Sequence, residues 1–106
     1  MKTMTTRPKT LYLDDEPMNL MIFEQIFKAR FEVLIAENSK VALKHLEENH
    51  DIVFLVTDMQ MPDILGTEFA KKVKTIYPKL PCAILTAYDL TDEIVQAMKA
   101  QQIVEY

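Results

Sequence analysis

The segment TLYLDDEP, residues 10–17, carries most of the information about the fold. Its first four residues form a short, largely apolar run, which is typical of a buried strand. Asp14, Asp15 and Glu16 end this run, and Pro17 suits the first turn of a helix, where its missing N–H is no loss. The segment therefore predicts a strand, an acidic turn and a helix in immediate succession.

Outward from this segment, the chain repeats the alternation of short apolar runs with segments of helical period. We expect five strands, at residues 10–13, 31–36, 52–56, 82–85 and 103–106, and four helices, at about 17–29, 40–48, 67–77 and 91–101. Ser39 would be the N-cap of the second helix. The third helix would place its apolar residues on one face: Phe69, Ala70, Val73, Ile76 and Tyr77. Such alternation is typical of parallel strands joined by crossover helices. Glu32 and Glu105 place the second and fifth strands at the edges, since a central parallel strand is buried on both faces. The predicted fold is a doubly wound α/β domain.

Composition restricts the function before any motif is considered. The chain has 106 residues, of which 49% are hydrophobic, which suits a single domain with one core. A net charge of -4 disfavours direct binding of nucleic acid, and no apolar run is long enough for a signal peptide or a membrane span. The single cysteine, Cys82, cannot form an internal disulfide. We therefore expect one cytoplasmic domain over residues 1–106.

Carboxylates follow two of the predicted strands. Asp14 and Asp15 end the first strand and Asp58 ends the third, so the three converge if these strands are neighbours. Three ionised carboxylates about 5 Å apart repel by roughly 3 kcal/mol per pair at an effective dielectric near 20. Either a carboxylate takes up a proton with a raised pKa, or a divalent cation binds, and oxygen ligands suit Mg²⁺ or Mn²⁺ better than zinc. Taken alone, Asp14 and Asp15 would favour a different interpretation, an acidic pair that caps a helix.

A hydroxyl at the end of the fourth strand extends this interpretation. Thr86 follows that strand, where it is placed to donate to an oxygen of a phosphoryl group. The chemistry suggested by the four residues is phosphoryl transfer to an aspartate.

Three motifs together resemble the receiver domain of response regulators, the CheY-like family of two-component signalling. They are LYLDDEP at 11–17, VTDMQMPDILG at 56–66 and ILTAY at 84–88. The resemblance covers essentially the whole chain in order and spacing. It implies a flavodoxin-like sheet with the strand order 2-1-3-4-5.

The resemblance also implies a role for each matching residue. Asp58 would be the phosphoacceptor, with Mg²⁺ (or Mn²⁺) bound directly by Asp15 and largely through water by Asp14. The main-chain carbonyl of Gln60 would be a further metal ligand. Thr86 would be the switch hydroxyl and Tyr106 the switch aromatic, whose ring turns inward when the hydroxyl moves.

The expected partner is a sensor histidine kinase or a phosphotransfer protein, and the chain would not be an enzyme beyond catalysing its own phosphorylation and dephosphorylation. Two alternatives come from other functional classes. One is a receiver-like protein-binding module that works without phosphorylation. The other is a Mg²⁺-dependent phosphatase with an aspartyl-phosphate intermediate, although such enzymes place the nucleophile in a D-x-D pattern and this strand ends DDE.

Two features of the sequence depart from the family pattern. The family places a lysine just past the fifth strand, and the sequence ends at Tyr106, about three residues short of it. The family's fifth helix, which would cover the first helix, is also missing, while residues 18–27 are apolar on more than one stripe. We therefore expect a C-terminally incomplete receiver domain that forms a homodimer through the uncovered first helix and the fifth strand.

Overall fold

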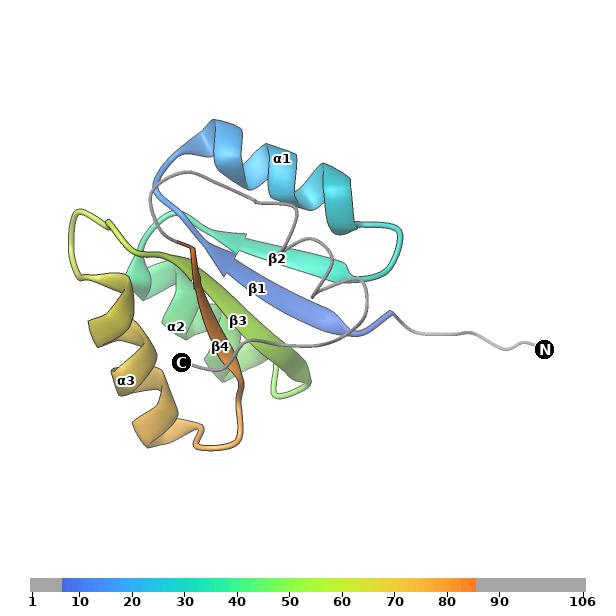
Figure 1. Cartoon of the computed structure of the whole chain (residues 1–106). Helices are drawn as coiled ribbons and strands as arrows, with labels where there is room; N and C mark the ends of the chain where they lie inside the picture. Colours follow the sequence, from blue (N-terminus) through green and yellow to red (C-terminus); the bar gives the residue numbers. More distant parts are fainter. Residues whose placement is uncertain (1–6, 86–106) are drawn as a thin grey trace.

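The structure, a computed structural model, describes residues 7–85. Its elements are β1 (Lys9–Leu13), α1 (Pro17–Phe27), β2 (Glu32–Ala36), α2 (Ser39–Glu48), β3 (Ile52–Asp58), α3 (Gly66–Ile76) and β4 (Cys82–Leu85). The strands form one parallel sheet in the order β2-β1-β3-β4 (Figure 1). The predicted α/β class and this part of the strand order are confirmed. The predicted fourth helix and fifth strand, with Thr86 and Tyr106, lie outside the described residues.

The sheet separates two layers of helix, with α1 on one face and α2 and α3 on the other (Figure 1). Because side chains alternate across a strand, β1 serves both layers. Leu11 and Leu13 join the core under α2 and α3, whereas Tyr12 joins the core under α1. Each strand of the interior thus contributes apolar side chains to both faces, which is why β1 and β3 are almost entirely buried.

Aromatic rings form the core under α1. The ring of Tyr12 stacks on Phe23 with centroids 4.2 Å apart, and Phe23 lies 4.7 Å from Phe27. Phe31 then links this helix to the sheet, with its centroid 6.4 Å from that of Phe27 and 5.3 Å from that of Phe54. Offset and edge-to-face pairs of this kind stabilise a core beyond the area that they bury. The row of rings ties α1 to β1 through Tyr12 and, by way of Phe31, to β3.

Several predicted boundaries are wrong by one or two residues. Strand β3 continues to Asp58 instead of ending at Val56, because Asp58 still pairs with Leu85 of β4. Helix α1 ends at Phe27 instead of about Ala29, since the N–H groups of residues 30 and 31 both donate to the carbonyl of Phe27. The other strands and helices begin or end within one residue of the prediction.

Two expectations about side chains are also wrong. The N-cap of α2 is Asn38 instead of Ser39, because the side chain of Asn38 accepts the N–H of Val41 at 2.9 Å. On α3, Phe69, Ala70 and Val73 are buried as expected, but Ile76 is 54% exposed. Within residues 7–85 we find no helix with the length and apolar character needed to cross a bilayer.

Candidate functional site

Three carboxylates meet where β1 and β3 end. Leu13 pairs with Thr57 in the sheet, so the residues that come next, Asp14 and Asp58, reach the same edge. One oxygen from each of Asp14, Asp15 and Asp58 can be chosen so that all lie within 4.8 Å of one another. The structure therefore brings together the three acidic residues that the sequence places at the ends of these strands.

Asp14 is the most firmly held of the three. It is only 2% exposed, and its Oδ2 accepts the hydroxyl of Tyr12 at 2.6 Å and the side-chain amide of Asn19 at 3.1 Å. Its Oδ1 accepts the N–H of Glu16 at 2.9 Å. The N–H of Asp14 donates to the carbonyl of Ala36, which extends the pairing of β1 with β2 up to the site. Hydrogen bonds thus hold both the backbone and the side-chain carboxylate of Asp14 in place.

The surroundings of Asp58 disfavour the ionised form of its carboxyl group. Burial raises the pKa of its carboxyl group above the usual value, the nearby charge of Asp14 raises it further, and Asp15 adds a smaller push in the same direction. The backbone N–H groups of Met59 and Gln60 oppose the shift in the pKa. Desolvation and repulsion together outweigh these hydrogen bonds, so the pKa of Asp58 in the folded chain lies above its usual value.

No cation among residues 7–85 pairs with these carboxylates. The ion pair of Lys9 with Asp51, 3.2 Å long, lies where β1 and β3 begin, at the opposite end of both strands. Three convergent carboxylates that have no positive partner within this range offer the oxygen ligands that Mg²⁺ and Mn²⁺ prefer. The residues present therefore fit a divalent cation of that class.

The loop after Asp58 is closed by a tight backbone contact. The N–H of Gly66 donates to the carbonyl of Met59 at 2.8 Å, and Gln60 forms an isolated bridge with Leu65. A Cβ atom at Gly66 would lie 2.4 Å from the carbonyl oxygen of Asp58, so only glycine allows the start of α3 to approach β3 so closely. This contact sets the position of the loop that carries Gln60.

The same loop is tied to α2. The carboxylate of Asp63 accepts both the N–H of Ser39, at 3.2 Å, and the Ser39 hydroxyl. These bonds hold the pKa of the Asp63 carboxyl below its usual value, chiefly through the hydroxyl. Asp63 thus satisfies a free N–H at the start of α2 and connects the loop to its neighbouring helix.

A comparison with protein families identifies the family to which this chain belongs. The model of the response regulator receiver domain matches residues 10–104. The chain belongs to the response regulator receiver family. It is accordingly a receiver of the two-component signalling class.

Relatives of this receiver include proteins of different sizes. It is 31% identical to the response regulator protein PilR of Pseudomonas aeruginosa over 96 residues. The matched region covers 90% of this chain and 21% of PilR. It is also 31% identical to the chemotaxis protein CheY1 of Helicobacter pylori, covering 87% of this chain and 77% of CheY1. The chain thus spans about a fifth of the length of PilR and about three quarters of that of CheY1.

Solved structures agree with the fold. A response regulator receiver domain protein from Clostridium thermocellum superposes with a TM-score of 0.71 at 33% identity, covering 87% of this chain and 75% of that one. The chemotaxis response regulator CheY4 of Vibrio cholerae gives a TM-score of 0.71 at 28% identity, covering 90% of this chain and 80% of its own.

Sequence reasoning missed the groups that surround the carboxylates. Tyr12 and Asn19 both donate to Asp14, and Ser39 donates to Asp63, yet none of these roles was expected. A partial signal was present for Tyr12, since residues two apart on a strand share a face. The roles of Asp14, Asp15, Asp58 and Gln60 remain predictions, as do those of Thr86 and Tyr106.

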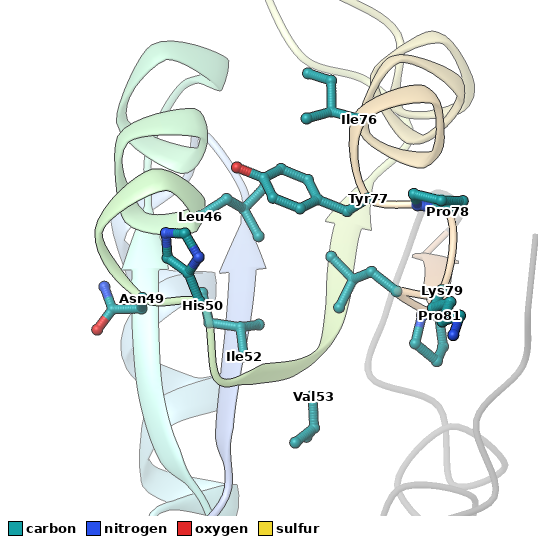
Figure 2. A pocket seen from close by; sticks show the side chains of 11 residues that line it. Leu46, Asn49, His50, Ile52, Val53, Ile76, Tyr77, Pro78, Lys79 and Pro81 are labelled. Atoms are coloured by element: carbon teal, nitrogen blue, oxygen red, sulfur yellow. The ribbon is translucent and has the colours of Figure 1, made fainter.

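The receiver also has a cavity at the opposite end of the sheet. Its volume is about 410 Å³, and it lies between the end of α2, the start of β3 and the segment that joins α3 to β4 (Figure 2). The lining is mainly apolar, with Leu46, Ile52 and Tyr77 among its walls, and residues 7–85 contribute no carboxylate to it. In an open parallel sheet, ligands bind outside the carboxyl ends of the strands. This cavity is therefore separate from the candidate site.

Proposed function

We propose that this receiver accepts a phosphoryl group on Asp58, with a divalent cation at the carboxylate cluster, and that the modification regulates an output. The donor would be a sensor histidine kinase or a phosphotransfer protein. The observation that supports this proposal is the convergence of Asp14, Asp15 and Asp58, within 4.8 Å, in a chain of the receiver family.

The transfer step follows from the position of Asp58. A carboxylate oxygen of Asp58 forms a bond to phosphorus while the phosphorus–nitrogen bond of a phosphohistidine donor breaks. The electron pair of that bond passes to the imidazole of the donor, which is protonated by solvent. Asp58 is half-buried at the strand end, so it remains open to a donor while the backbone of β3 and β4 holds it in place.

The neighbouring carboxylates make the site receptive to a cation. Asp14, Asp15 and Asp58 would hold Mg²⁺ or Mn²⁺ together with the main-chain carbonyl of Gln60. When bound, the cation supplies positive charge that offsets the repulsion between the carboxylates and the charge of an arriving phosphoryl group. Thr86 would donate its hydroxyl to the phosphoryl group, and Tyr106 would respond to the movement of Thr86.

The test is the intact mass of the chain after incubation with acetyl phosphate, with and without Mg²⁺. We expect a gain of one phosphoryl group that requires Mg²⁺ and is lost in Asp58→Asn. The exposed acidic residue Asp51, at the other end of β3, supplies the matched control, since Asp51→Asn should be labelled like the unchanged chain.

Two results would contradict the proposal. Labelling that persists in Asp58→Asn would assign the phosphoryl group to another residue. Absence of labelling in the unchanged, folded chain would favour a binding module that works without phosphorylation.

We also propose that the chain self-associates through α1. Four apolar side chains on this helix are exposed by 38% to 62%: Met18, Met21, Ile22 and Ile26. An uncharged apolar surface can pair with a second copy of itself without electrostatic repulsion. The fifth strand, the other expected contact, lies outside the described residues.

A further inference from the structure

The apolar cavity beside the start of β3 has the size of a small-molecule site. Its volume of about 410 Å³ lies within the range of pockets that hold small ligands in proteins. Leu46, Ile52 and Leu80 form its buried part, and the exposed side chain of Ile76 lies at its rim. Protein interiors leave few voids larger than a water molecule, so a hollow of this size is more than a packing defect.

The segment between α3 and β4 gives the cavity a rigid wall. Helix α3 ends just before Tyr77, and Pro78 cannot continue it. The N–H of Leu80 then donates to the carbonyl of Tyr77 at 3.0 Å, and the carbonyl of Pro81 accepts the N–H of Leu55 at 3.0 Å. These bonds and the two fixed proline rings hold the wall in shape before any ligand arrives, which lowers the entropic cost of binding.

Most polar side chains of the lining already have partners. Asn49 donates to a carbonyl in the last turn of α2 at 3.0 Å and accepts from Lys9 at 3.0 Å. A ring nitrogen of His50 lies 2.9 Å from the carbonyl of Glu47. Lys79 differs from them, because no acceptor among residues 7–85 pairs with its ammonium group.

Lys79 makes the cavity favour an anion, although the whole chain has a net charge of -4. No carboxylate of the described range lines the cavity, and Asp51, which precedes the lining residue Ile52, is paired with Lys9 at 3.2 Å. Interactions between exposed charges fade beyond about 8 Å at physiological ionic strength. The nearby ammonium group therefore has more influence on a ligand than the distant acidic residues.

The walls favour a flat apolar body. Figure 2 shows Tyr77 reaching from the end of α3 toward Leu46, with Lys79 beside Pro81. An aromatic ring packs well against a tyrosine ring in offset or edge-to-face geometry. A ligand with an aromatic body and one acidic group would match both the apolar walls and the ammonium group at the rim.

We propose that this cavity binds a small aromatic monocarboxylate, with its ring against Leu46 and Tyr77 and its carboxylate on the ammonium group of Lys79. The inference does not depend on phosphoryl transfer to Asp58, since the cavity lies at the other end of the sheet.

The first test locates the binding of a probe, 2-naphthoate, by NMR of isoleucine methyl groups. Ile52 and Ile76 line the cavity, whereas Ile22 and Ile26 are exposed on α1. On titration we expect the methyl resonances of Ile52 and Ile76 to shift and saturate, and those of the two α1 residues to stay in place. The absence of shifts at the cavity would overturn the proposal, as would equal shifts on α1, which would indicate binding to any exposed apolar surface.

The second test compares three probes of the same shape and different charge: 2-naphthoate, 2-(hydroxymethyl)naphthalene and 2-(aminomethyl)naphthalene. We expect the unchanged chain to bind the carboxylate about fivefold more tightly than the amine, as for an exposed ion pair. Lys79 is exposed, so Lys79→Glu should fold normally and reverse the preference. Lys71→Glu, at an exposed position of α3 outside the lining, changes the net charge equally and should keep the preference.

Two results of this comparison would contradict the proposal. Equal affinity of the three probes for the unchanged chain would show that the cavity recognises only an apolar body. A preference for the carboxylate that persists in Lys79→Glu would show that Lys79 is not the group that binds it.

Discussion

Asp58 holds its negative charge in surroundings that oppose it. Burial and the charge of Asp14 raise the pKa of its carboxyl group, so the folded chain binds a proton there more tightly than the unfolded chain does. The stability that this proton provides is fully present below the unfolded pKa of about 3.9, and it is lost as pH rises through the higher pKa of the folded state. At neutral pH the ionised Asp58 therefore lowers the free energy of unfolding.

Removing that charge should stabilise the metal-free chain. We expect Asp58→Asn to raise the free energy of unfolding by about 1 kcal/mol at pH 7, a modest gain because the group is half-exposed and solvent screens its repulsion. The gain should disappear below about pH 4, where the carboxyl group is neutral in both states. Urea unfolding across this pH range in the presence of a chelator measures both effects.

Glu47 on α2 provides the control for this comparison. It is exposed and lies outside the carboxylate cluster, so Glu47→Gln should not reproduce the gain at neutral pH. If Asp58→Asn had a lower free energy of unfolding than the unchanged chain at pH 7, the prediction would be wrong. Repulsion between the carboxylates would then already be offset by other groups of the chain.

Gly66 is required for close packing. In Gly66→Ala the new Cβ would meet the carbonyl oxygen of Asp58 at 2.4 Å, and because that oxygen belongs to the backbone of β3, the start of α3 must move instead. We expect a loss of about 2 kcal/mol in the free energy of unfolding, as for other overpacked sites. Thermal or urea unfolding measures it, with Thr67→Ala as the neighbouring control. Equal stability of Gly66→Ala and the unchanged chain would contradict the close approach.

Single residues differ in how well the sequence predicts their roles. Asp14, Asp15 and Asp58 could be placed together because strand ends and strand order determine their convergence. The donors Tyr12 and Asn19 could not, because each bond depends on a side-chain rotamer and on the exact entry of α1. Asp63 and Ser39 are 24 residues apart, and only the packed loop brings them together.

Among the elements, α1 has the most unusual surface. Leu20, Phe23 and Phe27 bury its inner face, while Met18 and Ile22 on its outer face are 62% and 43% exposed. A contiguous apolar surface on a helix is typical of an interface. The element is thus the first place to test for association.

A lysine introduced on the exposed apolar surface of α1 should prevent two copies of the chain from associating. We expect the unchanged chain to show a concentration-dependent rise in sedimentation coefficient, and Ile22→Lys to sediment as a monomer, because a buried, unpaired lysine is costly. Thr75→Lys adds the same charge at an exposed position of α3, on the other face of the sheet, and this variant should still associate. Monomeric behaviour of the unchanged chain at high concentration would overturn the interface.

Helices and strands were predicted well in their existence and less well at their ends. The alternation of apolar runs with helical periods is enough to locate each described element. Their last residues depend on tertiary pairing: the pairing of Asp58 with Leu85 prolongs β3, and the turn after Phe27 shortens α1. Such pairing is not encoded in any local window of sequence.

At the scale of the whole molecule, the two ends of the sheet differ in chemistry. The carboxylates gather where β1 and β3 end, whereas the apolar cavity of about 410 Å³ lies where β3 and β4 begin. The acidic end follows from strand polarity and could be predicted. The cavity could not, because it depends on how side chains from α2 and α3 fill the space beside the sheet.

The stacked, hydrogen-bonded Tyr12 has one more consequence. The chain contains four tyrosines and no tryptophan, so its near-ultraviolet absorption comes mainly from phenol rings. Only one of the tyrosines is bonded to a carboxylate of the cluster among the described residues. The absorption of a phenol depends on what its hydroxyl contacts, so this chromophore should report events at the acidic edge. The protein therefore carries a built-in optical reporter, and no dye or label has to be attached to follow it.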